Sequence, residues 1–471
     1  MTSTSPPISV VDPATGEEIA TVPVAGPAEV AAAVDAARAA FPAWWHRGTP
    51  ARAAAVERFA AMIEANAERL AVLDTRCTGM PISGMRAELR EAAARTRRIA
   101  HDAFLVLGDS APASLPGDIH VTHREPYGVV AVITPYNHPA LFALQAVAAI
   151  AMGNTAVLKP PDQAPLSSLL LGELADECFG PGVLTVATGD GPVTGEALVR
   201  HEGVDLVALT GSVAAGLRVL RASAETAVRP VLLELGGKNP IVVCADADVA
   251  AAADAAVTGL NLARCLGQSC TSTSRVLVHA SVHDAFVDAV AGRFAAMRPG
   301  RPLDPDCELG PLVSQRHRRS VLDRIAEGVA AGARVVTGGG SFAGTAFECG
   351  AYLEPTLLDG VEPGSPVEQE EIFGPVLSVL TWEDEQEAVR VANGVRYGLS
   401  ASIYTASLAS AQVLARDIQA AMVYVNSPVR ACRGFSPTPF KQSGIGDFPG
   451  GGLGDLTRYT RTKALHLFGP A

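Results

Sequence analysis

One cysteine of this chain stands in a setting that suits covalent chemistry. Cys270 lies in LGQSCTSTSR, among small polar residues and directly after Gly-Gln-Ser. A thiol that attacks a carbonyl needs a deprotonated sulfur, a donor that stabilises the oxyanion and a base that later activates water. Two distant motifs offer the other parts, because TPYNHP contains the amide of Asn137 and LELGGK contains the carboxylate of Glu234. The three residue types together predict nucleophilic attack on a carbonyl by Cys270.

The other readings of this thiol are a metal ligand, half of a disulfide and core filler. Eight cysteines without regular spacing in 471 residues do not suit a disulfide framework. Cys265 and Cys270 have no CxxC partner pair and no nearby HxxxH, so we expect no metal. Most of the thiols, Cys265 included, are expected to be small buried hydrophobes. A reversible bond between Cys265 and Cys270 under oxidation stays open.

The composition is that of a globular protein with more than one domain. The chain has 471 residues, of which 48% are apolar and 18% charged, and its net charge of −12 is dispersed. Without a block of Lys and Arg, nucleic acid is not an expected partner. The N-terminus lacks the pattern of a secretory signal, and the longest apolar stretch, 139–152, is too short to span a bilayer. We therefore expect a cytoplasmic protein with no membrane contact.

The elements that must position the three residues follow an alternating pattern. Ala-rich stretches over 27–41 and 52–71 carry apolar residues at helical spacing. Short apolar runs rich in β-branched residues come next, separated by helix-compatible segments, at 129–137, 154–160, 182–190 and 206–212. This alternation predicts a doubly wound α/β sheet of parallel strands, in which ligands bind beyond the carboxyl ends. The polar residues that end the runs are Asn137, Lys159, Asp162, Gly211 and Ser212.

A second alternating region, from about 240 to 400, predicts a second α/β domain that contains Cys270. The stretches 120–130 and 457–468 are typical of extended arms, whose edges need a partner. We expect a dinucleotide-binding domain from 1–110 and 128–235, and a catalytic domain from 236–433. The arms are expected at 111–127 and 456–471.

Ordered motifs along nearly the whole chain resemble those of the NAD(P)-dependent aldehyde dehydrogenases. They are VVDPATGEEIATVP, TPYNHP, LKPPDQAP, LTGSVAAG, LELGGKNP, GQSC, EEIFGPV and KQSGIG. GQSC alone would be a weak signal, whereas the ordered set is very specific. The resemblance implies an α/β fold of the aldehyde dehydrogenase type, with a doubly wound dinucleotide-binding domain, a second α/β catalytic domain and extended oligomerisation arms. It also implies a homodimer or homotetramer.

The resemblance assigns a role to each of the three reactive residues. It makes Cys270 the nucleophile, Glu234 the general base and Asn137 the oxyanion donor. The aldehyde would form a thiohemiacetal on Cys270, lose hydride to the nicotinamide and leave a thioester that water hydrolyses to a carboxylic acid. One oxyanion donor contributes about 3 to 4 kcal/mol in such sites.

The resemblance also implies the residues that bind the dinucleotide. Ser212 would present its hydroxyl and nearby amides to the pyrophosphate, which a helix N-terminus favours. Lys159 would lie near the adenosine ribose, and a carboxylate at Asp162 favours NAD over NADP because it repels a 2′-phosphate. The full expected set is Thr134, Pro135, Lys159, Asp162, Gly211, Ser212, Gly216, Glu371 and Phe373.

Positions that face the aldehyde depart from the family pattern. Arg264 matches an arginine with which succinate semialdehyde dehydrogenase holds a distal carboxylate, and a guanidinium suits that group. Gln145 replaces the second arginine of that enzyme, for which Arg430 and Arg433 would compensate. An acidic or polar aldehyde, such as a semialdehyde, is one expectation. The opposing reading pairs Arg264 with a protein carboxylate. The expected substrate residues are Arg264, His138, Gln145, Thr271 and Arg430.

Other function classes remain as alternatives. CoA-acylating relatives generally lack the base at the position of Glu234, so its presence disfavours that reaction. A cysteine esterase or thioesterase would need Cys270 but neither Ser212 nor Glu371. A non-catalytic member would be marked by loss of the nucleophile, which this chain retains.

Overall fold

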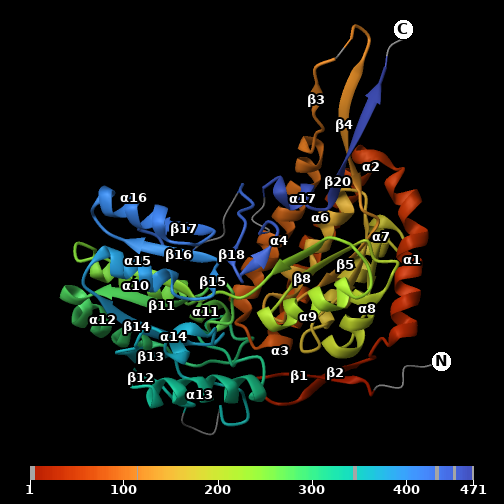
Figure 1. Cartoon of the computed structure of the whole chain (residues 1–471). Helices are drawn as coiled ribbons and strands as arrows, with labels where there is room; N and C mark the ends of the chain where they lie inside the picture. Colours follow the sequence, from red (N-terminus) through yellow and green to blue (C-terminus); the bar gives the residue numbers. More distant parts are fainter. Residues whose placement is uncertain (1–5, 114, 343–346, 430–433, 449–451, 469–471) are drawn as a thin grey trace.

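Two sheets lie side by side in the computed structural model, and a ribbon of strands projects from the body (Figure 1). The structure describes residues 6–113, 115–342, 347–429, 434–448 and 452–468. Among these residues, no helix combines the length and apolar character needed to cross a bilayer.

The first sheet has six strands in the order β19-β9-β8-β5-β6-β7, all parallel except β19. Alternate residues of β5 enter different apolar clusters. Val130 and Val132 belong to one cluster, and Val129 and Ala131 belong to the other. Both faces are therefore covered, which explains why this strand is a continuous apolar run. The strands are β5 (Val129–Ile133), β6 (Thr155–Lys159), β7 (Leu184–Val186), β8 (Leu206–Thr210), β9 (Val231–Glu234) and β19 (Gly444–Ile445).

Helices cover both faces of this sheet, as the alternating pattern predicts. The Ala-rich N-terminal region forms four successive helices, two of which lie on opposite faces of the sheet, because α1 joins one apolar cluster and α2 the other. The elements are α1 (Pro27–Trp45), α2 (Gly48–Ala65), α3 (Ala67–Thr78), α4 (Ile82–Asp102), η1 (Ala103–Leu105), α5 (Pro139–Ala143), α6 (Gln145–Ala151), α7 (Leu166–Phe179), η2 (Gly191–Gly195), α8 (Glu196–Arg200) and α9 (Val213–Ala224).

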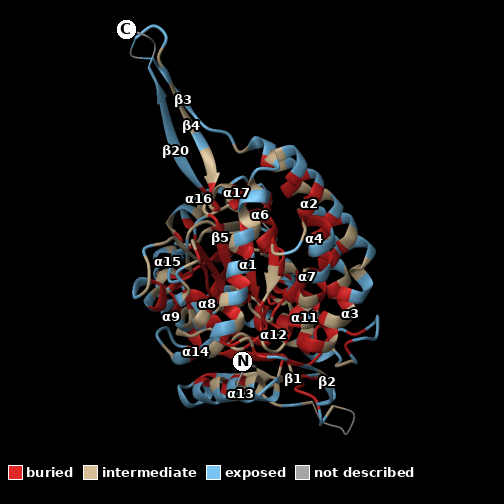
Figure 2. Ribbon diagram, turned by 90° about the vertical axis from the view of Figure 1, so that its right-hand side faces the viewer, coloured by how far each residue is buried: buried red, intermediate tan, exposed pale blue. Residues whose placement is uncertain are grey.

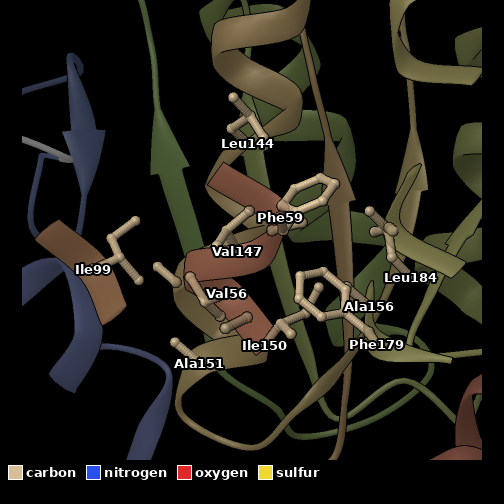
Figure 3. Close-up of a cluster of buried hydrophobic side chains, with 14 of the residues drawn as sticks. Val56, Phe59, Ile99, Leu144, Val147, Ile150, Ala151, Ala156, Phe179 and Leu184 are labelled. Carbon is tan, nitrogen blue, oxygen red and sulfur yellow. The ribbon is translucent and has the colours of Figure 1, made fainter. Parts of the chain in front are cut away.

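The largest apolar cluster lies under α2, α6 and α7. Val147 and Ile150 of α6 lie close to Val56 and Phe59 of α2, with Phe179 of α7 beside them (Figure 3). Figure 2 shows this buried interior beneath an exposed outer layer of helices. Because α5 and α6 follow directly after Asn137, this packing fixes the segment that carries the expected oxyanion donor.

The second sheet has seven strands in the order β12-β13-β14-β11-β10-β16-β17, parallel except for β12. The strands are β10 (Asn239–Val243), β11 (Thr273–His279), β12 (Arg334–Thr337), β13 (Thr356–Asp359), β14 (Val376–Trp382), β16 (Ser400–Tyr404) and β17 (Met422–Val425). The helices are α10 (Val249–Gly259), α11 (Leu262–Cys265), η3 (Ala280–Val282), α12 (His283–Ala296), α13 (Gln315–Ala330), α14 (Pro366–Gln369), α15 (Glu385–Asn393) and α16 (Leu408–Asp417). Cys270 lies between α11 and β11, at the edge that faces the first sheet.

The arm is a three-stranded ribbon in the order β20-β4-β3 (Figure 1). The stretch expected to be extended over 120–130 is divided, because β4 ends at Pro126 and Val129 begins the buried strand β5. Gly128 makes the turn with a φ of 134°, which favours glycine. The remaining elements are β1 (Ile8–Val11), β2 (Glu18–Val22), β3 (Ser110–Ala111), β4 (Ile119–Pro126), β15 (Tyr397–Gly398), β18 (Phe440–Lys441), α17 (Gly454–Thr457) and β20 (Thr460–Leu467).

Candidate active site

The loop that carries Cys270 is shaped by a glycine and a buried glutamine. Gly267 has a φ of 73°, and a Cβ there would lie 2.2 Å from the carbonyl oxygen of Gly374. Only glycine allows that approach. The side chain of Gln268 donates to the carbonyl of Cys265 at 3.0 Å, which closes the turn. The GQSC motif thus brings the nucleophile candidate against the loop that follows Glu371.

Cys270 is half-buried, and its backbone is held by the segment that follows Glu234. The side-chain amide of Asn239 donates to the Cys270 carbonyl at 2.8 Å. A Cβ on Gly237 would lie 2.5 Å from the same carbonyl oxygen, so the Gly-Gly pair permits this contact. Burial, together with the charges of Glu371 and Glu234, raises the pKa of the Cys270 thiol. The thiol is therefore neutral near pH 7, and its nucleophilic form grows as the pH rises.

Glu234 ends strand β9 and is 7% exposed. Among the residues that the structure describes, neither of its carboxylate oxygens has a hydrogen-bond partner. Burial raises the pKa of Glu234 well above its usual range, and the charge of Arg458 partly opposes that rise. A buried carboxylate without a partner is unfavourable for folding, so such a group points to function. Its free lone pairs can accept a proton from water.

The segment 134–139 carries Asn137, which is 3% exposed. It starts at the carboxyl end of β5, where the backbone N–H of Thr134 donates to the Lys159 carbonyl at 3.1 Å. Pro135 follows, and the ring of Tyr136 lies 6.0 Å from the ring of Phe373 in an edge arrangement. The predicted oxyanion donor therefore lies in a segment that contacts Phe373, and Gly267 of the Cys270 loop packs against Gly374 of the same loop.

A cavity of about 210 Å³ opens between η2, α8 and α9, beside the carboxyl ends of β5 and β8. The walls of this cavity are largely apolar. A flat aromatic group such as adenine suits walls of this kind. We did not predict these residues from the sequence, although the apolar stripe of α9, with Ala215, Val219 and Ala222, was a usable signal. The lining residues are Ile133, Gly191, Pro192, Gly195, Glu196, Val199, Leu209, Ala215, Arg218, Val219 and Ala222.

The N-terminus of α9 adjoins this cavity. Ser212 is the exposed N-cap residue, and its hydroxyl accepts from the N–H of Ala215 at 3.2 Å. Gly211 precedes it at the end of β8. Gly216 is buried, and a Cβ there would lie 2.9 Å from Leu235, so this glycine lets α9 pack closely onto the sheet. A helix N-terminus beside an apolar cavity suits the pyrophosphate and adenine of a dinucleotide.

Lys159 and Asp162 lie at the end of the neighbouring strand. Lys159 is 5% exposed. Burial lowers the pKa of its ammonium, while the charges of Asp162 and Asp190 act in the opposite direction. The lysine and both carboxylates therefore lie near one another at the carboxyl edge of the sheet, within reach of the ligand position that parallel sheets use.

Glu371 and Phe373 approach the site from the second sheet. The Glu371 carboxylate accepts from the Gly237 N–H at 3.0 Å, and a Cβ on Gly236 would lie 2.1 Å from it. Burial raises the pKa of Glu371 to about 7. Phe373 has a φ of 58°, and its carbonyl accepts from Nε2 of His317 at 2.7 Å. His317 was not predicted, because nothing near it in the sequence marks it.

The residues expected at the substrate have mixed positions. Arg264 Nε donates to the carboxylate of Glu88 at 2.6 Å, although 41% of the Arg264 side chain is exposed. Arg264 therefore pairs with a protein carboxylate, as the second of the two expectations stated. Two others have polar protein contacts: Gln145 lies 3.4 Å from the hydroxyl of Thr210, and Thr271 lies 3.2 Å from that of Ser269. His138 also contacts Glu88, whereas Arg430 and Arg433 lie outside the described residues.

The loop of Cys270 thus contacts the segment that follows Glu234, the segment of Asn137 contacts Phe373, and an apolar cavity lies beside the N-terminus of α9. A thiol, a carboxylate and an amide can form and hydrolyse a covalent adduct of a carbonyl compound, and a bound dinucleotide would take the hydride.

Known proteins resemble this chain over nearly its full length. The model of the aldehyde dehydrogenase family matches residues 1–465. The chain is 38% identical over 467 residues to the aldehyde dehydrogenase tropH of Talaromyces stipitatus, covering 97% of this chain and 89% of that protein. It is 39% identical over 467 residues to the 3,6-anhydro-alpha-L-galactose dehydrogenase of Streptomyces coelicolor, covering 98% of this chain and 93% of that protein.

A crystal structure of an indole-3-acetaldehyde dehydrogenase with NAD⁺ has the same fold. It matches with a TM-score of 0.94 at 37% identity, over 99% of this chain and 94% of that chain. The agreement in sequence, fold and site leads to one identification. The chain belongs to the aldehyde dehydrogenase family and is an enzyme of NAD(P)-dependent aldehyde oxidation.

Proposed function

We propose that the protein oxidises an aldehyde to the carboxylic acid, with Cys270 as nucleophile, Glu234 as general base and Asn137 as oxyanion donor. One observation carries this proposal. Glu234 is buried, and among the described residues neither of its carboxylate oxygens has a hydrogen-bond partner. Hydrolysis of a thioester needs a group that takes a proton from water, and a carboxylate without another partner is available for that step.

The reaction divides among the three residues as follows. The Cys270 thiolate bonds to the carbonyl carbon, and the oxygen that becomes negative accepts from the Asn137 amide and the Cys270 N–H. Bound NAD(P) supplies the acceptor for the hydride that leaves this thiohemiacetal. Glu234 then takes a proton from the water that attacks the thioester carbon. The carbon–sulfur bond breaks, which releases the acid and restores the thiolate.

We propose NAD as the cofactor, with NADP as the alternative. The apolar cavity beside α9 would hold the adenine, the Ser212 end of α9 the pyrophosphate, and Glu371 with Phe373 the nicotinamide half. Lys159 would lie near the adenosine ribose. The carboxylate of Asp162 favours NAD, because it would repel the 2′-phosphate of NADP.

The titration of Glu371 makes NAD binding dependent on pH. Its pKa is raised to about 7 by burial, so the carboxylate gains its charge as the pH increases through neutrality. A charged carboxylate is the better acceptor for ribose hydroxyls. We expect NAD affinity to rise about tenfold between pH of about 6 and about 8, following the ionised fraction. Calorimetric titration of NAD across this range measures it.

The matched variant for this experiment is Glu371→Gln, which keeps the size and removes the charge. It should bind NAD more weakly at pH of about 8 and show no rise with pH. An equal slope in both proteins would assign the titration to another group.

For the substrate we propose an aldehyde with a polar or anionic distal group. The Nε of Arg264 donates to Glu88. The two terminal nitrogens of the Arg264 guanidinium have no acceptor among the described residues. Those N–H groups belong to a side chain that is 41% exposed. A guanidinium in that state can still bind a carboxylate.

A screen of NADH formation tests the substrate class, using aliphatic, aromatic and carboxylate-bearing aldehydes with NADP in parallel. We expect Arg264→Leu to raise KM for carboxylate-bearing aldehydes about tenfold, since a charged hydrogen bond is lost. The ratio of KM values for charged and uncharged aldehydes of equal length is the readout, because it cancels changes in the shared catalytic geometry. Arg416→Leu, an exposed arginine on α16, is the control. An unchanged ratio in Arg264→Leu would rule out an acidic substrate held by this residue.

We propose that the arm, 111–127 and 456–471, joins copies of the chain into a dimer or tetramer. It carries exposed apolar side chains, at Ile119, Leu465, Leu467 and Phe468. Strands with free edges and apolar faces favour pairing with another chain. The segments 1–110 and 128–235 would form the dinucleotide-binding domain, and 236–433 the catalytic domain.

A further inference from the structure

Glu88 is a buried carboxylate that connects two segments of the active site. It lies in the middle of α4, and its side chain is 1% exposed. One turn earlier on the same helix, Met85 packs with Cys265 in a small apolar cluster. The α4 face that bears both residues therefore faces the segment leading to Cys270.

Within the described ranges, Glu88 has two hydrogen-bond partners, and both come from the segments that carry the proposed catalytic residues. His138 Nδ1, directly after Asn137, donates to Oε1 of Glu88 at 2.6 Å. Arg264 Nε, on the helix before the Cys270 loop, donates to the same oxygen at 2.6 Å. One carboxylate oxygen thus joins segments that are remote in the sequence.

The backbone at His138 shows why this anchor matters. His138 has a φ of 64° and a ψ of 55°, a left-handed conformation that is uncommon for residues other than glycine. Such a conformation persists where surrounding contacts hold it. Two carboxylates supply those contacts, since Glu88 binds the His138 ring and Asp74 of α3 accepts from the Ala140 N–H at 3.2 Å.

Electrostatics favour an ionised Glu88. Burial by itself would raise its pKa, but His138 and Arg264 outweigh that effect and hold the pKa of Glu88 below its usual value. A charged acceptor forms stronger hydrogen bonds than a neutral one. Loss of the charge would weaken both anchors together.

We propose that Glu88 is a positioning residue that sets the Asn137 amide relative to the Cys270 sulfur. The proposal rests on the catalytic roles proposed above for those two residues. Glu88 acts through His138 and Arg264 and touches no reacting atom in this account. Its effect should appear only in steps that use the amide and the sulfur together.

The test is Glu88→Gln, which keeps the shape and removes the charge. We expect the NADH burst to slow about tenfold or more, since small displacements of catalytic groups are costly. Alkylation of Cys270 by iodoacetamide forms no oxyanion and does not need Asn137, so its rate should change less than about twofold. The NAD dissociation constant should also stay unchanged, because α4 contributes nothing to the walls of the apolar cavity.

A double-mutant cycle with His138→Phe identifies the route of the effect. If Glu88 acts through His138, the double variant should slow the NADH burst by less than the product of the two single fold-changes. The control is Glu68→Gln, which removes an exposed carboxylate paired with Arg86 of α4 at 2.6 Å and should leave the burst unchanged. An unchanged burst in Glu88→Gln, or equal slowing of burst and alkylation, would overturn the proposal. If Cys270→Ala remains active, the proposed function fails whatever Glu88 does.

Discussion

Replacing Cys270 with alanine should lower NADH formation by about 10⁴-fold or more, since no other group can form the covalent intermediate. Cys270→Ser should be nearly as inactive, because a hydroxyl is far less nucleophilic than a thiolate. Steady-state NADH absorbance measures the loss. With an aldehyde whose thioester hydrolyses slowly, mass spectrometry should detect a covalent adduct on the native chain and none on the variants. NAD binding by calorimetry should be retained in both variants.

The control for a general thiol effect is Cys349→Ala, which removes an exposed cysteine and should leave activity unchanged.

Activity of the native enzyme should also increase with pH above neutrality. The raised pKa of Cys270 leaves little thiolate near pH 7, and the thiolate fraction grows with pH. Turnover within about tenfold of the native rate in Cys270→Ala would refute the covalent mechanism.

Glu234→Gln should separate the two halves of the reaction. Hydride release needs only the sulfur and the oxyanion donor, so one NADH per site should still form rapidly. Hydrolysis of the thioester loses its base, and steady-state turnover should fall about 10² to 10³-fold. Rapid-mixing absorbance gives the burst, and mass spectrometry of the quenched protein gives the acyl-enzyme. Loss of the burst together with turnover would assign Glu234 to the first half-reaction instead.

The same variant should be more stable than the native protein. Glu234 is buried with no hydrogen-bond partner in the part of the chain that the structure describes, and its folded pKa is raised above the value in the unfolded chain. The folded state therefore binds its proton more tightly, and the native protein loses stability as the pH rises from the unfolded pKa through the folded pKa. Glutamine does not titrate, so its advantage in urea midpoint should grow over that interval. We expect about 1 to 3 kcal/mol near neutral pH.

Local patterns in the sequence were sufficient for much of the fold. The runs at 129–137, 154–160 and 206–212 contain β5, β6 and β8, because strands covered on both faces are continuously apolar. Ordered motifs predicted the family, which the family model and the relatives confirm. The same motifs predicted Asn137, Glu234 and Cys270 as catalytic residues, and their roles stay predictions that the variants above test.

The ends of the strands were harder to predict from the sequence. The extended stretch 120–130 contained the end of an arm strand and the start of a core strand, and only burial separates them. Gly216 packs against Leu235, and its expected place at the dinucleotide stays a prediction.

The sequence by itself determined the alternation of strands and helices, the order of the motifs and the residue types available for chemistry. These properties depend on neighbours along the chain, so local periodicity reports them. Only the tertiary structure decided that Glu88 binds His138 and Arg264, which lie 50 and 176 residues away in the sequence. It also decided which apolar residues of α8 and α9 line a cavity instead of the core. Contacts of this kind depend on how whole elements pack, and no local pattern records that geometry.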